Sequence, residues 1–274
     1  MPLARADLES LLRTRRLDRT LTTALPGVDP RDETAVAPSA HAGLDAHLGG
    51  GLPRGQLSEV VGARSSGRTS LLLQLAAAAT RRGELVAVVD ALDALDVESA
   101  AAGDVDLTRL LWVRGHVVTN PGLCGDLNQR ALEQAIRAFT LVLQAGNFGL
   151  VVLDVAEAPL PALRRLPFTT WLRLQRMVEG TQTAALLVGP QPMARSSAGL
   201  TLQLGARGLG VGDWGLERSG NGGSRNNGSM ERLGIRFGHS LFDGLNVEAR
   251  VVRARARERE AGSVTLSTCA IDCA

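Results

Sequence analysis

The 274-residue chain contains no lysine and no tyrosine, so all thirty of its basic residues are arginine. Aromatic residues make up only 3% of the chain, and its three cysteines, Cys124, Cys269 and Cys273, show neither a disulfide framework nor zinc-ligand spacing. The apolar runs are too short to span a bilayer. Asp7 and Glu9 lie where a signal peptide needs an apolar run. These absences exclude a disulfide-rich secreted protein and a membrane span, and they predict a cytoplasmic protein.

The composition that remains is that of a globular protein. Hydrophobic residues are 45% and charged residues 21%, which is enough to bury a substantial core. Thirty basic residues against twenty-eight acidic ones leave a net charge of +2. No overall charge excess therefore points to nucleic acid as a partner.

The chain is predicted to divide into four parts. Residues 1–25 are predicted to form a basic amphipathic helix, because leucines recur near helical spacing and arginines occupy the polar positions. Residues 26–42 are expected to be a proline-containing linker, residues 43–268 the folded core, and residues 269–274 a short tail. Within the core, residues 213–230 are rich in Gly, Ser and Asn, which predicts a flexible inserted loop.

The core shows apolar runs that alternate with helical patterns. Such continuous apolar strands, separated by helices, predict an α/β fold with a mostly parallel, doubly wound sheet covered by helices on both faces. Three later segments alternate apolar and polar residues and predict closing antiparallel strands at 233–237, 246–257 and 263–268. The expected parallel strands are 56–61, 84–90, 110–113, 149–154 and 184–188, and the expected helices are 69–82, 127–145 and 169–179.

A glycine-rich loop follows the first of these strands and opens an apolar helix, which is the context that a phosphate-binding loop requires. Glycines let backbone N–H groups turn toward a phosphate, and the helix N-terminus adds partial positive charge. The Thr69 hydroxyl can ligate Mg²⁺, and Asp154, at the end of a later strand, can hold the metal through water. The candidate nucleotide-binding residues are Gly62, Ser65, Ser66, Gly67, Arg68, Thr69 and Ser70.

The usual lysine of such a loop is replaced by Arg68. A planar guanidinium is bulkier than an ammonium and differently shaped, so this exchange is not conservative. ATP and Mg²⁺ remain possible ligands, but we expect weak binding and little hydrolysis, because hydrolysis depends on exact positioning and charge neutralisation. The alternative is that the loop persists only as a turn.

The residues around this loop resemble bacterial RecA. Residues 44–62 resemble its glycine-rich lead-in, and Ser65, Ser66 and Gly67 match a tripeptide of its phosphate loop. Later stretches with the same likeness are residues 88–96, 151–154 and 247–253. The resemblance covers residues 43–268 and implies a RecA-like core of the P-loop NTPase type.

Several departures from RecA concern its chemistry and motion. Leu92 stands where RecA has its catalytic glutamate, and leucine cannot orient or deprotonate water. Asp93 is expected to point elsewhere on an extended segment. The two mobile DNA-binding loops of RecA correspond to a short stiff turn at 156–161 and to residues 189–198. In the latter, prolines flank Gln191, which lies near the family's switch glutamine, and they restrict the backbone.

A RecA-like core with a leading basic helix and a degenerate ATP site is similar to the ImuA proteins. That resemblance implies an accessory role in SOS mutagenesis and translesion synthesis after DNA damage, in the bacterial cytoplasm with activity at the nucleoid. The implied partners are an ImuB-type polymerase-like protein, an error-prone replicative polymerase subunit and RecA itself. One alternative is an active RecA-superfamily ATPase or recombination mediator that binds ATP and single-stranded DNA. Another is a regulator that caps RecA filaments.

Two arginine clusters add candidate interaction surfaces. In the first cluster, Arg253, Arg255, Arg257 and Arg259 share one face of a predicted strand, because side chains alternate along a strand. This row of guanidiniums is either a surface for DNA phosphate or an acidic partner, or a charged edge that protects the strand from aggregation. Few aromatic residues lie nearby to stack bases. The second cluster, Arg164, Arg165, Arg173 and Arg176, is either such a patch or a solvated helix face. The candidate interaction surface, with the N-terminal helix included, is Leu8, Leu11, Leu12, Arg15, Arg16, Arg253, Arg255 and Arg257.

Overall fold

An eight-stranded sheet forms the centre of the protein in the computed structural model, which describes residues 35–115, 125–206, 244–254 and 263–269. The strand order is β10-β9-β8-β3-β7-β6-β4-β5. Six strands run parallel, and β9 and β10 pair antiparallel beyond β8. The strands are β3 (Leu57–Gly62), β4 (Val86–Asp90), β5 (Leu110–Arg114), β6 (Leu150–Asp154), β7 (Ala184–Gly189), β8 (Leu200–Ala206), β9 (Gly244–Ala254) and β10 (Ser263–Cys269). The predicted α/β fold, with a mostly parallel sheet and closing antiparallel strands, is confirmed.

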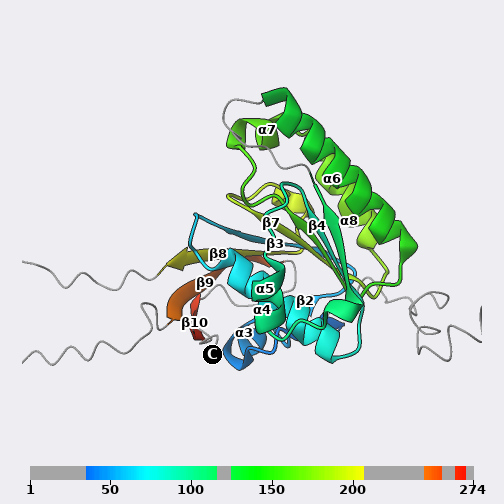
Figure 1. Cartoon of the computed structure of the whole chain (residues 1–274). Helices are drawn as coiled ribbons and strands as arrows, with labels where there is room; N and C mark the ends of the chain where they lie inside the picture. Colours follow the sequence, from blue (N-terminus) through cyan, green and yellow to red (C-terminus); the bar gives the residue numbers. More distant parts are fainter. Residues whose placement is uncertain (1–34, 116–124, 207–243, 255–262, 270–274) are drawn as a thin grey trace, which may run out of the picture.

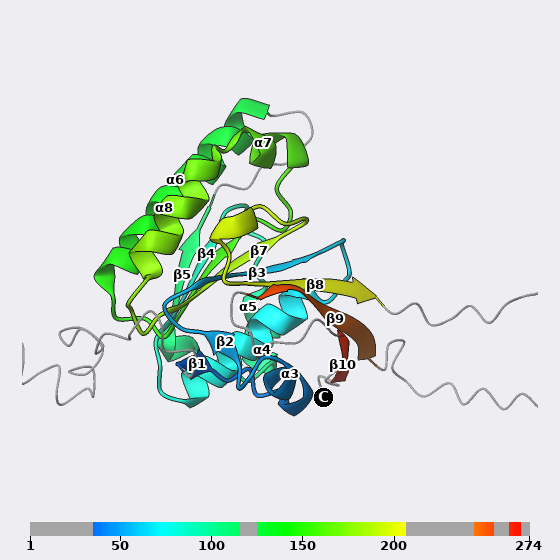
Figure 2. The same cartoon turned by 180° about the vertical axis from the view of Figure 1, so that it is seen from behind.

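Helices cover both faces of the sheet, as Figures 1 and 2 show from opposite sides. One face carries α6 (Gly125–Ala145), α7 (Leu160–Arg165) and α8 (Phe168–Val178), with α6 and α8 side by side. The other face carries α3 (Ala42–His47), α4 (Arg68–Arg81) and α5 (Val97–Ala102). Strands β9 and β10 curve toward this second layer, where β10 contacts α3.

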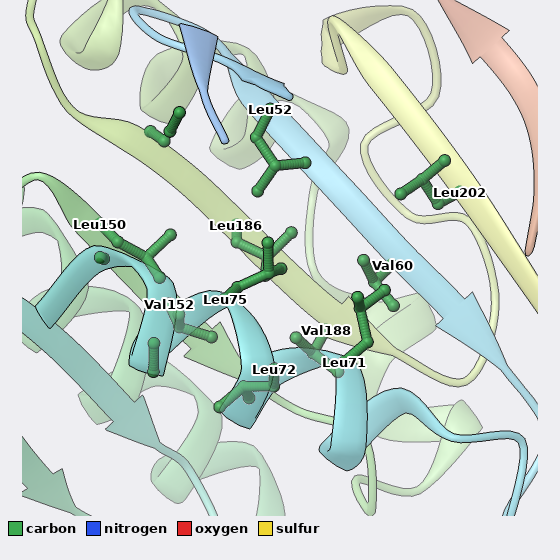
Figure 3. Packing of buried hydrophobic residues seen from close by; sticks show 14 of the residues in the cluster. Leu52, Val60, Leu71, Leu72, Leu75, Leu150, Val152, Leu186, Val188 and Leu202 are labelled. Atoms are coloured by element: carbon green, nitrogen blue, oxygen red, sulfur yellow. The ribbon is translucent and has the colours of Figure 1, made fainter. Parts of the chain in front are cut away.

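Alternate residues of the central strands feed two separate cores. In β6, Leu150 and Val152 belong to the core beneath α4, whereas Val151 and Leu153 belong to the core beneath α6 and α8. Figure 3 shows the α4 side, where leucines of this helix meet residues of β3, β6 and β7. Because each strand is buried on both faces, its sequence is a continuous apolar run, which explains why the strands could be recognised from the sequence.

The last part of the expected linker is integrated into the fold. Val36–Ala37 forms strand β1 and pairs antiparallel with β2 (Leu52–Pro53). Ala37 is buried in the α4-side core. The pairing joins segments that are about fifteen residues apart in the chain, and two-residue strands carry no periodic pattern that the sequence could reveal.

Several predictions fall on residues outside the described ranges. These are the basic helix at 1–25, the loop at 213–230 and the strand at 233–237. In the described part of the chain, none of the helices combines the length and apolar character needed to cross a lipid bilayer.

Candidate functional site

Three chemically important chain segments meet at the carboxyl edge of the parallel sheet. The phosphate loop leaves β3 after Gly62, while Asp90 and Asp154 are the last residues of β4 and β6. Asp90 and Asp154 are direct neighbours in the register of these two strands. This edge is where α/β sheets bind their ligands, because the loops and helix N-termini gather there.

The backbone of the loop has the shape that phosphate binding needs. Gly67 caps α4 with a φ of +87°, and no side chain in the described part of the chain caps the amides of the helix's first turn. A Cβ on Gly67 would lie 2.6 Å from Cγ2 of Val247, so glycine is required there for space as well as for φ. Ser65 also has a positive φ, of +59°. Unpaired amides at a helix N-terminus are donors for an anion, so the backbone fits a phosphate group.

The Arg68 side chain does not lie free for a ligand. It is 5% exposed, and its Nη1 donates to the carbonyl oxygen of Ala156 at 3.2 Å. Its Nη2 contacts Oε1 of Glu157 at 3.4 Å, and the other oxygen of Glu157 pairs with the exposed Arg64 at 2.5 Å. Burial lowers the pKa of the Arg68 guanidinium, while Glu157 and then Asp154 oppose that shift. Arg68 thus ties the phosphate loop to the segment that follows β6.

The carboxylate expected to hold a metal is Asp154, at the end of β6. Burial raises the pKa of Asp154 to about 6; the N–H of Ala156, 2.8 Å from its Oδ1, opposes the rise, and Asp90 adds to it. Arg68 contributes positive charge to Asp154. Within the described ranges, no three His, Cys, Asp or Glu residues cluster in a way that could hold a metal ion. The loop backbone fits a phosphate, while the Arg68 side chain is engaged with Ala156 and Glu157 of the same chain.

Leu92, which occupies the position of the RecA catalytic glutamate, lies in the turn that follows β4. Leu92 packs against the core beneath α6 and α8, so no carboxylate is present there to act on water. The expectation that Asp93 continues an extended segment is wrong. Asp93 has a φ of +57°, and both of its oxygens accept hydrogen bonds from Arg114 at 2.7 Å. Asp90 stabilises this turn, because its Oδ2 accepts the N–H of Leu95 at 2.7 Å.

A buried glutamate that sequence reasoning missed anchors the segment after β7. Glu59 is 0% exposed, and its Oε1 accepts the N–H groups of Met193 at 2.8 Å and Ala194 at 2.6 Å. Its Oε2 accepts the hydroxyl of Thr201 at 3.1 Å. Burial raises the pKa of Glu59, and these hydrogen bonds oppose the rise. The signal for this anchor was a lone carboxylate within an apolar strand.

Comparison with known proteins identifies the family. The family model of the RecA N-terminal domain matches residues 23–163. The chain belongs to this RecA family. It is 40% identical over 136 residues to protein RecA of Clavibacter michiganensis and, to the same extent, to protein RecA of Salinispora tropica. These matches cover 49% of the chain but only 34% and 35% of the relatives, so the chain spans about a third of the RecA proteins that it matches.

A solved structure agrees on the fold. The RadB recombinase superimposes with a TM-score of 0.54 over 84% of this chain and 94% of that chain, at 16% sequence identity. At that identity the likeness concerns the fold alone. The RecA-like superfamily expected from the sequence is confirmed.

The remaining candidate residues differ in how far their side chains are exposed to solvent. Thr69 is exposed in the first turn of α4, while Ser66 is buried and its hydroxyl has no hydrogen-bond partner within the described residues. Arg253 is exposed on β9 opposite Thr201. The other candidate interaction residues, Leu8, Leu11, Leu12, Arg15, Arg16, Arg255 and Arg257, lie outside the described ranges.

Proposed function

We propose that this protein is a RecA-like accessory factor that acts through protein contacts and does not turn over ATP. The observation that carries the proposal is the engagement of Arg68 with the Ala156 carbonyl and Glu157. The positive charge of the same guanidinium also acts on Asp154 at this sheet edge. A phosphate loop held in this way has a structural role, because it connects the start of α4 to the segment that follows β6.

The contacts of Arg68 oppose nucleotide binding. An Arg68 that turned toward a phosphate would have to leave both of its acceptors. The guanidinium would exchange these contacts for an ion pair with the phosphate, so a nucleotide gains less from Arg68 than it would from an unengaged cation. Glu157 would keep the exposed Arg64 as its partner in either case. We therefore infer that ATP binds weakly at cellular concentration.

The surroundings also oppose hydrolysis. Leu92 offers no base to the attacking water. The segment after β7, where RecA has its second mobile loop, is held by Glu59 through two backbone hydrogen bonds. A nucleotide that did bind would lack both a group to activate water and a segment free to respond.

The cellular role that we propose is the one implied by the likeness to ImuA proteins. The protein would assist SOS-induced mutagenesis and translesion synthesis by contacting an ImuB-type polymerase-like protein, an error-prone replicative polymerase subunit or RecA. Pull-down of these purified candidates by the full chain tests this role. Binding to none of the three would contradict it.

The nucleotide part of the proposal is tested by ATPase assays and by binding of a fluorescent ATP analogue, each with and without single-stranded DNA. The wild type is expected to show no turnover. Arg68→Lys is expected to bind the analogue about tenfold more tightly, because a lysine ammonium cannot bridge both acceptors of the guanidinium.

The matched control is Arg64→Lys, the same exchange in the same loop at a side chain that is 84% exposed. This variant should bind the analogue as the wild type does. Turnover at the rate of a recombinase by the wild type would refute the accessory role. Equal effects of the two exchanges would refute the role of Arg68 in blocking the loop.

A further inference from the structure

Two hollows lie on the α6–α8 side of the molecule, on opposite flanks of α8. The larger, of about 450 Å³, lies between α7, the start of α8 and the segment after β7. The smaller, of about 240 Å³, lies between α6 and α8. Leu166, which precedes α8, lines both hollows. We call their combined surface the α7–α8 groove.

The charge of the groove is one-sided. Arg164 and Arg195 line the larger hollow, and the smaller one adds three more arginines and a single acidic residue, Glu133. Within the described ranges, none of the five guanidiniums pairs with a carboxylate. The three arginines of the smaller hollow are Arg137, Arg165 and Arg173.

The floor of the larger hollow is apolar and firmly held. Leu163, Trp171 and Met193 line it and are buried in the core beneath α6 and α8. The backbone N–H of Met193 is bonded to Glu59, so the wall after β7 is fixed. Phe168 lies at the groove with 38% of its surface exposed.

We propose that the α7–α8 groove binds an acidic peptide segment of a partner protein. A bulky apolar side chain of the peptide occupies the larger hollow against Phe168, and flanking carboxylates pair with Arg164 and Arg195. This arrangement, with an apolar anchor in a pocket and charges around it, is common in protein interfaces, where arginine and aromatic residues dominate the binding energy. The inference names a contact surface for the accessory role and rests on that proposed function.

The shape of the groove favours a peptide over single-stranded DNA. Binding of single strands without sequence preference uses several aromatic side chains on which successive bases stack. Of the aromatic residues lining the two hollows, only Phe168 is exposed, because Trp171 is buried.

The test measures fluorescence anisotropy of labelled peptides on the full chain. The panel contains peptides with Leu, Phe or Trp anchors between glutamates, the same peptides with alanine in place of the anchor, versions flanked by arginine, and a single-stranded oligonucleotide. The wild type is expected to bind anchored acidic peptides with a Kd on the order of 10 µM. The alanine and arginine versions should bind at least about tenfold more weakly.

The variants are Arg164→Glu with Arg195→Glu, and Phe168→Ser, at positions whose side chains are at least partly exposed. Each is expected to weaken peptide binding at least about tenfold, and Arg164→Lys with Arg195→Lys should retain most of it. The matched control, Arg81→Glu, changes an exposed arginine at the end of α4, on the opposite face of the sheet, and should have no effect.

The proposal is wrong if no peptide of the panel binds or if Arg81→Glu weakens binding as much as the groove variants. It is also wrong if the oligonucleotide binds more tightly than every peptide and loses binding in the groove variants. None of these outcomes concerns ATP, so failure of the groove proposal is distinguishable from ATP turnover, which would refute the accessory role itself.

Discussion

Replacement of Asp154 by asparagine should stabilise the protein at neutral and higher pH. Asp154 lies at the end of β6 with a partly exposed side chain. It is beside Asp90, and burial raises its pKa to about 6. In the unfolded chain the same group has a pKa of about 3.8. The folded protein therefore binds this proton more tightly, and its stability falls as the pH rises from about 4 through about 6.

The magnitude follows from these two pKa values. At about 1.4 kcal/mol for each tenfold change in the ionisation constant, ionised Asp154 costs the fold about 3 kcal/mol well above pH 6. Asparagine removes that cost and can still accept the N–H of Ala156 through its Oδ1. The substitution also removes the favourable interaction between the charges of Arg68 and Asp154, which offsets part of this gain. The expected net gain is therefore about 1–3 kcal/mol at about pH 8 and close to zero at about pH 4.

Urea unfolding of the wild type and of Asp154→Asn at these two pH values measures the effect. The matched control is Asp104→Asn, at an exposed position with a φ of +62°, which asparagine tolerates. The control should leave the pH dependence of stability unchanged. If Asp154→Asn destabilises the protein at about pH 8, or if its effect is the same at both pH values, burial does not dominate the ionisation of this carboxylate.

Two further predictions concern the backbone around the site. Glu59→Ala should lower the free energy of unfolding by about 3–5 kcal/mol, because it leaves two buried amides unpaired, and should speed tryptic cleavage at Arg195. Glu59→Gln, whose Oε1 keeps both bonds, should restore most of the loss, and equal loss in both variants would contradict this account. Gly67→Ala should cost about 2–4 kcal/mol through its φ and the clash with Val247. Gly83→Ala, with a similar φ but open space around it, should cost only about 1 kcal/mol, and calorimetry should separate the two.

Local patterns explain why so much of the fold was predictable. The apolar runs of the parallel strands correspond to β3, β4, β5, β6 and β7 within one or two residues at their ends. The glycine-rich loop and the helix that it opens also follow from neighbouring residues, since α4 begins at Arg68 within one residue of the predicted start. Burial on both faces and the turn chemistry of glycine both leave a mark in the sequence at short range.

Long-range contacts explain what was not predictable. The sequence placed Arg68 in the phosphate loop, but not its bonds to residues 88 and 89 positions further along the chain. Glu59 accepts hydrogen bonds from residues 134 and 135 positions away. The arginines on α7 and α8 were recognised as a cluster, but their junction with Arg195 and an apolar hollow was not.

The amino-acid sequence by itself determined the RecA-like sheet, the phosphate loop and the loss of the lysine and glutamate that ATP hydrolysis uses in that family. Only the tertiary structure decided that the replacing arginine is joined to the segment after β6, that a buried carboxylate holds the segment after β7, and that arginines from separate segments surround one groove. The physical reason is the distance along the chain over which each kind of interaction acts. Periodicity and turn preferences act between neighbouring residues, whereas the partner of a buried charge is chosen by how distant strands come together.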